Sequence, residues 1–209
     1  MDPNRIVAIY GSPRRRGNTA TLMNAAVAGA RAAGAQVDEI VLRDLKLSPC
    51  MEIYSCRESG ECRIRDDFQG VRERVLSAAG LMLASPIFYY AVSAHTKILM
   101  DRFHSLWVKR AWVKPSLPRP AERRKGLFIS TGATRGRRLF EGTLLSVRYF
   151  FDTLDMDLWR ALLYRGLEDE TDVLGHPDYL AEAGRAGGEL AQAIRSDGND
   201  LNGACAPQE

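Results

Sequence analysis

Short runs of apolar residues alternate along the chain with longer segments whose apolar residues recur at helical spacing. Residues 5–10 (RIVAIY) and 80–85 (GLMLAS) are apolar almost throughout, which is typical of strands that a sheet buries on both faces. Residues 36–42 (QVDEIVL) alternate apolar and polar positions, which predicts a strand at or near a sheet edge. With residues 125–130 and 157–163, the sequence predicts five strands.

A helical segment follows each predicted strand. The first begins near Asn18 and Thr19, two residue types that favour the N-cap position. Strands that alternate with helices in this way predict an α/β fold: a doubly wound, five-stranded parallel sheet with helices on both faces. The predicted helices span residues 18–33, 68–79, 92–108, 138–154 and 178–194.

These elements predict a single domain over residues 1–195, followed at 196–209 by a polar tail that we expect to be flexible. Two connections, residues 43–67 and 104–124, are too long for simple turns. Long connections within a compact domain are usually functional or in contact with a partner. The second connection carries two tryptophans, which indicates a contact between subunits.

Composition and charge exclude several classes of protein. The chain has 209 residues, of which 45% are hydrophobic and 26% charged, so one sizeable core can form. A net charge of +3 is too small to indicate a nucleic-acid partner. The longest apolar stretch, residues 78–94, is interrupted by serine and proline and is shorter than the roughly 20 residues of a membrane span. The first residues resemble neither a signal nor a transit peptide, so we expect a cytoplasmic protein without structural disulfides and without a membrane partner.

The turn after the first strand carries groups that can surround a phosphate. Residues 11–19 (GSPRRRGNT) combine glycines, hydroxyl and amide side chains and arginines, and in this fold class the turn leads into the N-terminus of the first helix. The turn is not a Walker A loop, because Asn18 stands where the lysine is required, and it contains neither G-x-G-x-x-G nor a cysteine. An ordinary basic loop with a helix cap is the alternative interpretation.

Two further loops follow predicted strands. Residues 86–94 (PIFYYAVSA) are apolar and aromatic, which suits a flat heteroaromatic ligand; packing against another subunit is the alternative. Residues 130–134 (STGAT) are small and polar and let a ligand approach the backbone closely. Because parallel strands end at one edge of the sheet, the three loops should converge there.

The segments GSPRRRGNT, SPIFYYAVSAHTKILMDR, STGAT and DYLAEAGRAGGELAQAI resemble the NADPH-dependent FMN reductase family, and within it the branch of iron–sulfur flavoproteins. The resemblance covers residues 5–195 and implies a flavodoxin-like fold with strand order 2-1-3-4-5, bound FMN, and a homodimer or homotetramer. It assigns contacts near the FMN phosphate to Ser12, Arg14, Gly17, Asn18 and Thr19. Around the isoalloxazine ring it places Pro86, Ile87, Phe88, Tyr89, Thr131 and Gly132.

The cysteines are where the chain departs from that branch. Members that hold a cluster carry C-x-x-C-x-x-C and a fourth cysteine before an Asp-Asp pair, whereas this chain keeps Cys50, Cys56 and Cys62 and has Ile53 at the place of the second cysteine. A [4Fe–4S] cluster ordinarily needs four thiolates, and the remaining Cys205 lies in the tail. We therefore expect a remnant of a cluster loop rather than an Fe–S site; a redox-active thiol pair and a bound cluster are the alternatives.

The activity that the resemblance implies is that of an FMN-dependent NAD(P)H oxidoreductase. Hydride would pass from NADPH or NADH to the flavin and then to a small-molecule acceptor such as free flavin or a quinone. No side chain has to act as an acid or base, so no catalytic residue is assigned. The alternatives are an electron-transfer flavoprotein that a protein partner reduces and a flavin-binding sensor without turnover.

Overall fold

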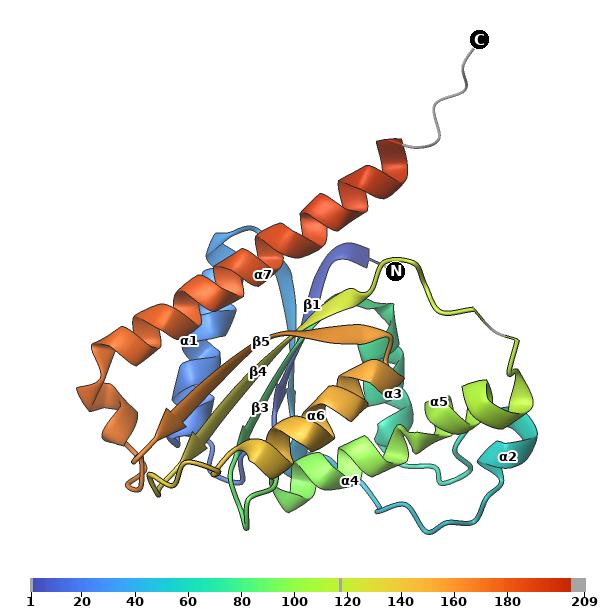
Figure 1. Ribbon diagram of the computed structural model, residues 1–209, viewed down its shortest axis with the longest axis horizontal. Helices are drawn as coiled ribbons and strands as arrows, with labels where there is room; N and C mark the ends of the chain where they lie inside the picture. Colours follow the sequence, from blue (N-terminus) through green and yellow to red (C-terminus); the bar gives the residue numbers. More distant parts are fainter. Residues whose placement is uncertain (1, 117, 204–209) are drawn as a thin grey trace.

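The computed structural model describes residues 2–116 and 118–203, with side chains as far as residue 196 (Figure 1). A five-stranded parallel sheet in the order β2-β1-β3-β4-β5 forms its centre. The predicted fold class and the strand order 2-1-3-4-5 are therefore confirmed. The strands are β1 (Asp2–Tyr10), β2 (Gln36–Val41), β3 (Ala78–Pro86), β4 (Arg124–Gly132) and β5 (Met156–Arg165).

Helices cover both faces of the sheet and give it two cores. One core packs α1 and α7 against the sheet, and the other packs α3, α4 and α6 against the opposite face (Figure 1). Because helices cover both faces, β1 from Ile6 onward and β3 read as nearly unbroken apolar runs. The long helices are α1 (Asn18–Ala32), α3 (Phe68–Ser77), α4 (Ala94–Arg102), α6 (Glu141–Thr153) and α7 (Pro177–Gly203). The short ones are η1 (Leu42–Asp44), α2 (Cys56–Ser59), α5 (His104–Val108), η2 (Lys109–Val113) and η3 (Asp172–Gly175).

Small residues let α1 and α7 pack backbone to backbone. A Cβ atom added to Gly29 would lie 1.9 Å from the carbonyl oxygen of Gly184, and one added to Gly187 would lie 1.9 Å from that of Ala26. Only glycine permits such an approach. The close contact fixes the position of α1, and with it the loop that leads into the helix.

Helix α1 begins at Asn18 as predicted, but its predicted N-cap and several other predicted helix boundaries are wrong. Gly17 is the N-cap of α1, and Asn18 and Thr19 lie in its first turn, because their side chains bond to other loops instead of to the helix end. The helix predicted over 92–108 breaks at Phe103 into α4 and α5, and a π-helical turn, η2, extends it to Val113.

The last helix, α7, does not end at Ile194 as predicted but continues to Gly203. A helix already formed can add residues without new tertiary contacts, because each added residue contributes its own backbone hydrogen bond. Residues 204–209, with Cys205, lie outside the described residues. In the described part of the chain, none of the helices has the length and apolar character that crossing a membrane requires.

Candidate functional site

The loops after β1, β3 and β4 meet at the carboxyl edge of the sheet, as predicted. The amide of Gly11, after β1, donates to the carbonyl of Ala84 at 2.7 Å, and the amide of Ile87, after β3, donates to the carbonyl of Thr131 at 2.9 Å. The hydroxyl oxygens of Thr19 and Thr131 lie 2.7 Å apart. These bonds join the ends of β1, β3 and β4 to the start of α1.

Buried serines hold this edge together, a role that the sequence analysis missed. The Ser93 hydroxyl donates to the carbonyl of Gly11 at 2.5 Å, and the Ser93 amide donates to the Ser85 hydroxyl at 2.9 Å. Ser130 donates to the carbonyl of Ser85 at 2.7 Å. Ser93 is also the N-cap of α4 and accepts from the amide of Thr96, so the spacing Ser-x-x-Thr is a signal that could have identified it.

The N-terminus of α1 is open to an anion. Gly17 has no side chain to cap the helix, so the first backbone N–H groups keep their donor capacity and no cap neutralises the positive end of the helix dipole. The stem of Arg14 passes over Gly17, since a Cβ added there would lie 3.1 Å from that of Arg14. Arg15 pairs with Asp44 at 2.5 Å, whereas Arg14 is exposed and forms no ion pair with a described residue.

Ser12 and Asn18 are both buried, but their side chains differ in direction. Ser12 accepts from the Arg14 amide at 3.1 Å and borders a cavity of about 150 Å³ beside the loop. The Asn18 amide group donates to the carbonyl of Asp169 at 2.7 Å and accepts from the amide of Val173 at 3.0 Å. Asn18 therefore fastens the loop after β5 to α1, and a contact with phosphate through its side chain stays a prediction.

The loop after β3 is a strained turn that presents aromatic rings. Phe88 and Ala91 exchange two backbone hydrogen bonds of 2.9 Å, and the residues between them, Tyr89 and Tyr90, have φ of 49° and 61°. Positive φ at both central positions is the geometry that asparagine and glycine usually supply. Tyr89 is 98% exposed. Backbone strain of this kind concentrates at ligand-binding sites.

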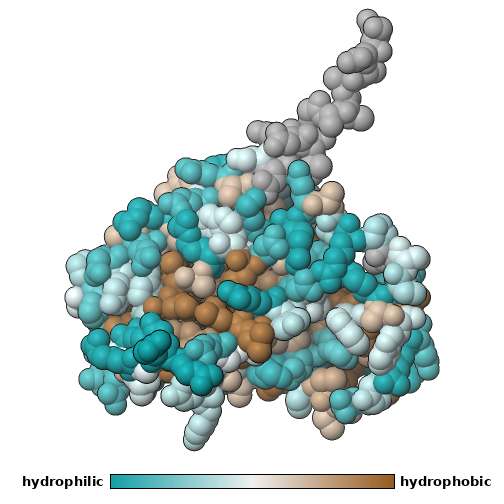
Figure 2. Space-filling model, in the orientation of Figure 1, coloured by the Kyte–Doolittle hydropathy of each residue, from teal (hydrophilic) through white to brown (hydrophobic). Residues whose placement is uncertain are grey.

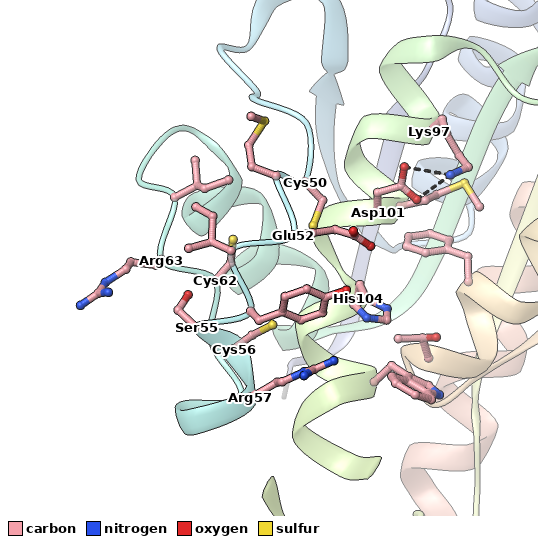
Figure 3. Close-up of a pocket in the computed structure, with 18 of the residues that line it drawn as sticks. Cys50, Glu52, Ser55, Cys56, Arg57, Cys62, Arg63, Lys97, Asp101 and His104 are labelled. Atoms are coloured by element: carbon pink, nitrogen blue, oxygen red, sulfur yellow. Dashed lines mark hydrogen bonds and ion pairs between the residues drawn. The ribbon is translucent and has the colours of Figure 1, made fainter. Parts of the chain in front are cut away.

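The cysteine loop, residues 48–65, covers a second and larger hollow. A cavity of about 830 Å³ lies between this loop and helices α4, α5 and α6, and Cys50, Cys56 and Cys62 all line it (Figure 3). Burial, and then the neighbouring thiols of Cys50 and Cys62, raise the pKa of Cys56. Among the described residues, no three His, Cys, Asp or Glu side chains are grouped so that they could hold a metal ion.

A buried ion pair closes the base of the cysteine loop. Arg102 donates to Asp66 at 2.6 Å, to the carbonyl of Ser48 at 2.8 Å and to that of Ile64 at 3.0 Å. Asp66 in turn accepts from the amides of Ser48 and Phe68. This clamp joins residues 48 and 64–66 to the end of α4. The sequence analysis did not predict that contact.

The two tryptophans of the second long connection also reach the cavity. The ring centroids of Trp107 and Trp112 are 5.6 Å apart, and both rings line the cavity together with the three cysteines. The connection therefore packs against the cysteine loop of its own chain. The predicted contact of these tryptophans with another subunit stays a prediction.

Comparison with known proteins gives this architecture a family. Residues 4–156 match the NADPH-dependent FMN reductase family. The chain is 37% identical over 102 residues to an iron-sulfur flavoprotein of Methanocaldococcus jannaschii, a match that covers 49% of this chain and 53% of that protein. Overall, the chain spans about half the length of the curated relatives it matches.

Solved structures show the same fold at low identity. An NAD(P)H:quinone oxidoreductase from Methanothermobacter marburgensis has a TM-score of 0.68 at 18% identity, over 89% of this chain and 98% of that one. An FMN-dependent NADH-azoreductase from Bacillus anthracis, solved with FMN, has a TM-score of 0.61 at 16% identity, over 90% and 100%. With most of its length matched by one family and its sheet in that family's flavodoxin-like order, the chain belongs to the NADPH-dependent FMN reductase family.

Proposed function

We propose that this protein is an FMN-dependent oxidoreductase that takes hydride from NADPH or NADH and passes the electrons to a small-molecule acceptor such as free flavin or a quinone. The convergence of three linked loops at the carboxyl edge, beside the open N-terminus of α1, carries the proposal. FMN, when bound, supplies the redox chemistry, because its ring accepts a hydride from a nicotinamide and returns the electrons to an acceptor.

The first loop fits the phosphate end of FMN. A dianionic phosphate would accept from the backbone N–H groups of the first turn of α1, where the helix dipole favours negative charge. Gly17 leaves room for this approach, Ser12 adds a hydroxyl, and Arg14 adds a guanidinium that no described carboxylate neutralises. Asn18 and Thr19 would contribute backbone amides, since their side chains bond to other loops.

The second and third loops fit the isoalloxazine ring. Pro86, Ile87, Phe88 and Tyr89 would form an apolar and aromatic wall, with Thr131 and Gly132 at the opposite side. Gly132 packs closely, since an added Cβ would lie 2.7 Å from Leu139 and 3.6 Å from Ile87. Backbone N–H groups at this edge would stabilise negative charge on the reduced ring, so no acid or base side chain is needed.

The neighbouring structures support the nicotinamide donor and the small acceptor. One of them is an NAD(P)H:quinone oxidoreductase and another an FMN-dependent NADH-azoreductase. A second candidate function is an electron-transfer flavoprotein that a protein partner reduces. The likeness to an iron-sulfur flavoprotein and the retained cysteine loop favour this second candidate.

A homodimer or homotetramer is the assembly that the exposed surface supports. Figure 2 shows an apolar patch on the face where α6 and the edge strand β5 lie toward the viewer, and several apolar residues of β5 remain only half-buried. Further exposed aromatic side chains that do not line the cavity of the cysteine loop are Phe88, Tyr89 and Tyr90. The cytoplasmic location stays a prediction.

An anaerobic absorption spectrum tests the proposal. The purified protein is loaded with FMN, and the flavin bands are followed after addition of NADPH or NADH. Fast bleaching supports the oxidoreductase, and bleaching by dithionite alone supports the electron carrier. Failure to bind FMN contradicts the assigned site.

Substitution of the arginines tests the phosphate loop itself. Arg14→Gln should weaken FMN binding about 10-fold or more, because it removes a charge-assisted hydrogen bond worth roughly 1.5–3 kcal/mol. Arg15→Gln is the matched control, since Arg15 already pairs with Asp44 and should leave FMN affinity nearly unchanged.

A further inference from the structure

The cavity under the cysteine loop is separate from the three flavin-binding loops, and the proposed function leaves it without a role. Its volume of about 830 Å³ lies in the range of small-molecule sites. Three elements build its walls: the cysteine loop on one side, α4 with α5 and η2 on another, and α6 on the third (Figure 3). Such a hollow between helices and a loop has the size and shape of a binding site.

Aromatic rings line much of this cavity. Trp107 and Trp112 meet edge to face, and the His104 ring stacks on Trp107 at a centroid distance of 5.2 Å. Tyr54 extends the aromatic surface from the cysteine loop, with its backbone held at a φ of 59°. Aromatic side chains at several angles favour a planar aromatic ligand, because such a ligand can pack on them both offset-stacked and edge to face.

One cationic side chain, that of Arg57, packs on the aromatic wall of the cavity. The Arg57 guanidinium lies 3.9 Å from the centroid of the Tyr54 ring and 4.3 Å from that of Trp112, so the rings restrict its position. No described carboxylate pairs with Arg57. Lys97, also at the cavity, is neutralised by Asp101 at 2.6 Å. Arg57 is therefore the cationic group at this wall that an anionic ligand can use.

Glu52 sets a further condition on the ligand. Its side chain points into the cavity (Figure 3), and a φ of 47° holds its backbone in the left-handed region. A carboxylate beside the cavity repels a purely anionic ligand but accepts hydrogen bonds. A ring that carries an N–H or hydroxyl group as well as the anionic substituent satisfies both Glu52 and Arg57.

We propose that this cavity is a binding site for a planar aromatic molecule that carries an anionic substituent and a hydrogen-bond donor. The ring system lies against Tyr54, Trp107 and Trp112, the anion contacts Arg57, and the donor faces Glu52. The neutral thiol of Cys56 completes the wall without adding charge. Binding in this cavity does not require reduction of the flavin, so this proposal is tested separately from the proposed function.

Calorimetric titration with two matched probes tests the proposal on the FMN-loaded protein. The probe 8-anilinonaphthalene-1-sulfonate has two ring systems, an N–H group and a sulfonate, and N-phenyl-1-naphthylamine is the same molecule without the sulfonate. We expect the sulfonate to bind at one site per chain and at least 10-fold more tightly than the neutral probe. Arg57→Gln should remove this preference, because it deletes the charge-assisted contact. Arg65→Gln is the matched control, since Arg65 is an exposed arginine of the same loop that does not line the cavity, and it should leave both affinities unchanged.

The second variant fills the cavity with a large side chain. Ser146→Trp on α6 fills the hollow from the wall opposite the cysteine loop, and we expect it to abolish binding of both probes while FMN content and the flavin spectrum stay as in the wild type. Equal sulfonate affinity in the wild type, Arg57→Gln and Ser146→Trp would overturn the proposal, as would no binding at all. An affinity that falls with rising protein concentration, in step with dimer formation, would also overturn it by identifying a second copy of the chain as the occupant.

Discussion

Asp66→Asn tests whether a side-chain clamp holds the cysteine loop in place. The substitution preserves the shape of Asp66 but removes the charge that Arg102 neutralises. The Arg102 side chain is 0% exposed and that of Asp66 is 10% exposed, so solvent does not screen their interaction. The pair therefore belongs with buried ion pairs, where removal of one partner costs about 3–5 kcal/mol, and not with surface pairs of about 0–1 kcal/mol.

The expected loss is a fall of about 3–5 kcal/mol in the free energy of unfolding, measured by urea denaturation at neutral pH and a fixed FMN concentration. Asp101→Asn is the control, because its exposed pair with Lys97 predicts a change of at most about 0.5 kcal/mol. The clamp also predicts faster alkylation of Cys50, Cys56 and Cys62 in Asp66→Asn, read by mass spectrometry. A loss below 1 kcal/mol together with unchanged alkylation rates would refute the reasoning.

The pH dependence of the same variant gives an independent check. Burial opposes ionisation of Asp66, but the hydrogen bonds from Arg102 and from the amides of Ser48 and Phe68 outweigh it and lower the pKa of Asp66. The stabilisation is therefore complete above the unfolded pKa of about 4 and is lost as the pH falls through the lower folded pKa. The stability difference between the wild type and Asp66→Asn should shrink below about pH 4; a constant difference would contradict the assignment.

Two further substitutions follow from backbone geometry. Tyr90→Gly should raise the free energy of unfolding by up to about 1 kcal/mol, because glycine adopts a φ of 61° without steric cost, and denaturant titration that shows a loss would mean that the turn is unstrained. Gly187→Ala should destabilise by about 1–3 kcal/mol, since the added Cβ would lie 1.9 Å from the carbonyl oxygen of Ala26. Gly188→Ala, whose Cβ meets only an ordinary 3.4 Å contact, should instead stabilise by up to about 1 kcal/mol, and thermal denaturation that ranks the two variants alike would contradict the packing of α1 on α7.

The sheet was predictable because the pattern of apolar residues within each strand indicates how that strand is buried. Strands β1 and β3 are apolar on both faces, and β2 alternates as an edge strand does, so period and burial agree. The convergence of the three loops then follows from topology alone, since parallel strands end at one edge. The sheet and the convergence of the loops can be predicted without knowing which side chains are in contact.

The features that the sequence did not reveal depend on partners far along the chain. Asn18 looks like a helix cap, but its side chain bonds to Val173, 155 positions away. The cavity requires the cysteine loop to meet Trp107 and Trp112, and Arg102 to reach Asp66, 36 positions away. Local periodicity carries no information on such contacts. A residue type indicates what a side chain can bond to, and only the fold decides which partner is present.

The clamp also explains how the cysteine loop can persist without a full set of cluster ligands. Its closure depends on Asp66, Arg102 and the backbone of residues 48 and 64. The predicted replacement of a cluster cysteine by Ile53 is therefore compatible with an intact closure. Since the loop keeps its position over α4, α5 and α6, the space beneath it stays open and lined by aromatic rings. The predicted loss of a cluster ligand and the retention of a ligand-sized cavity are thus compatible in the same loop, because different residues determine each.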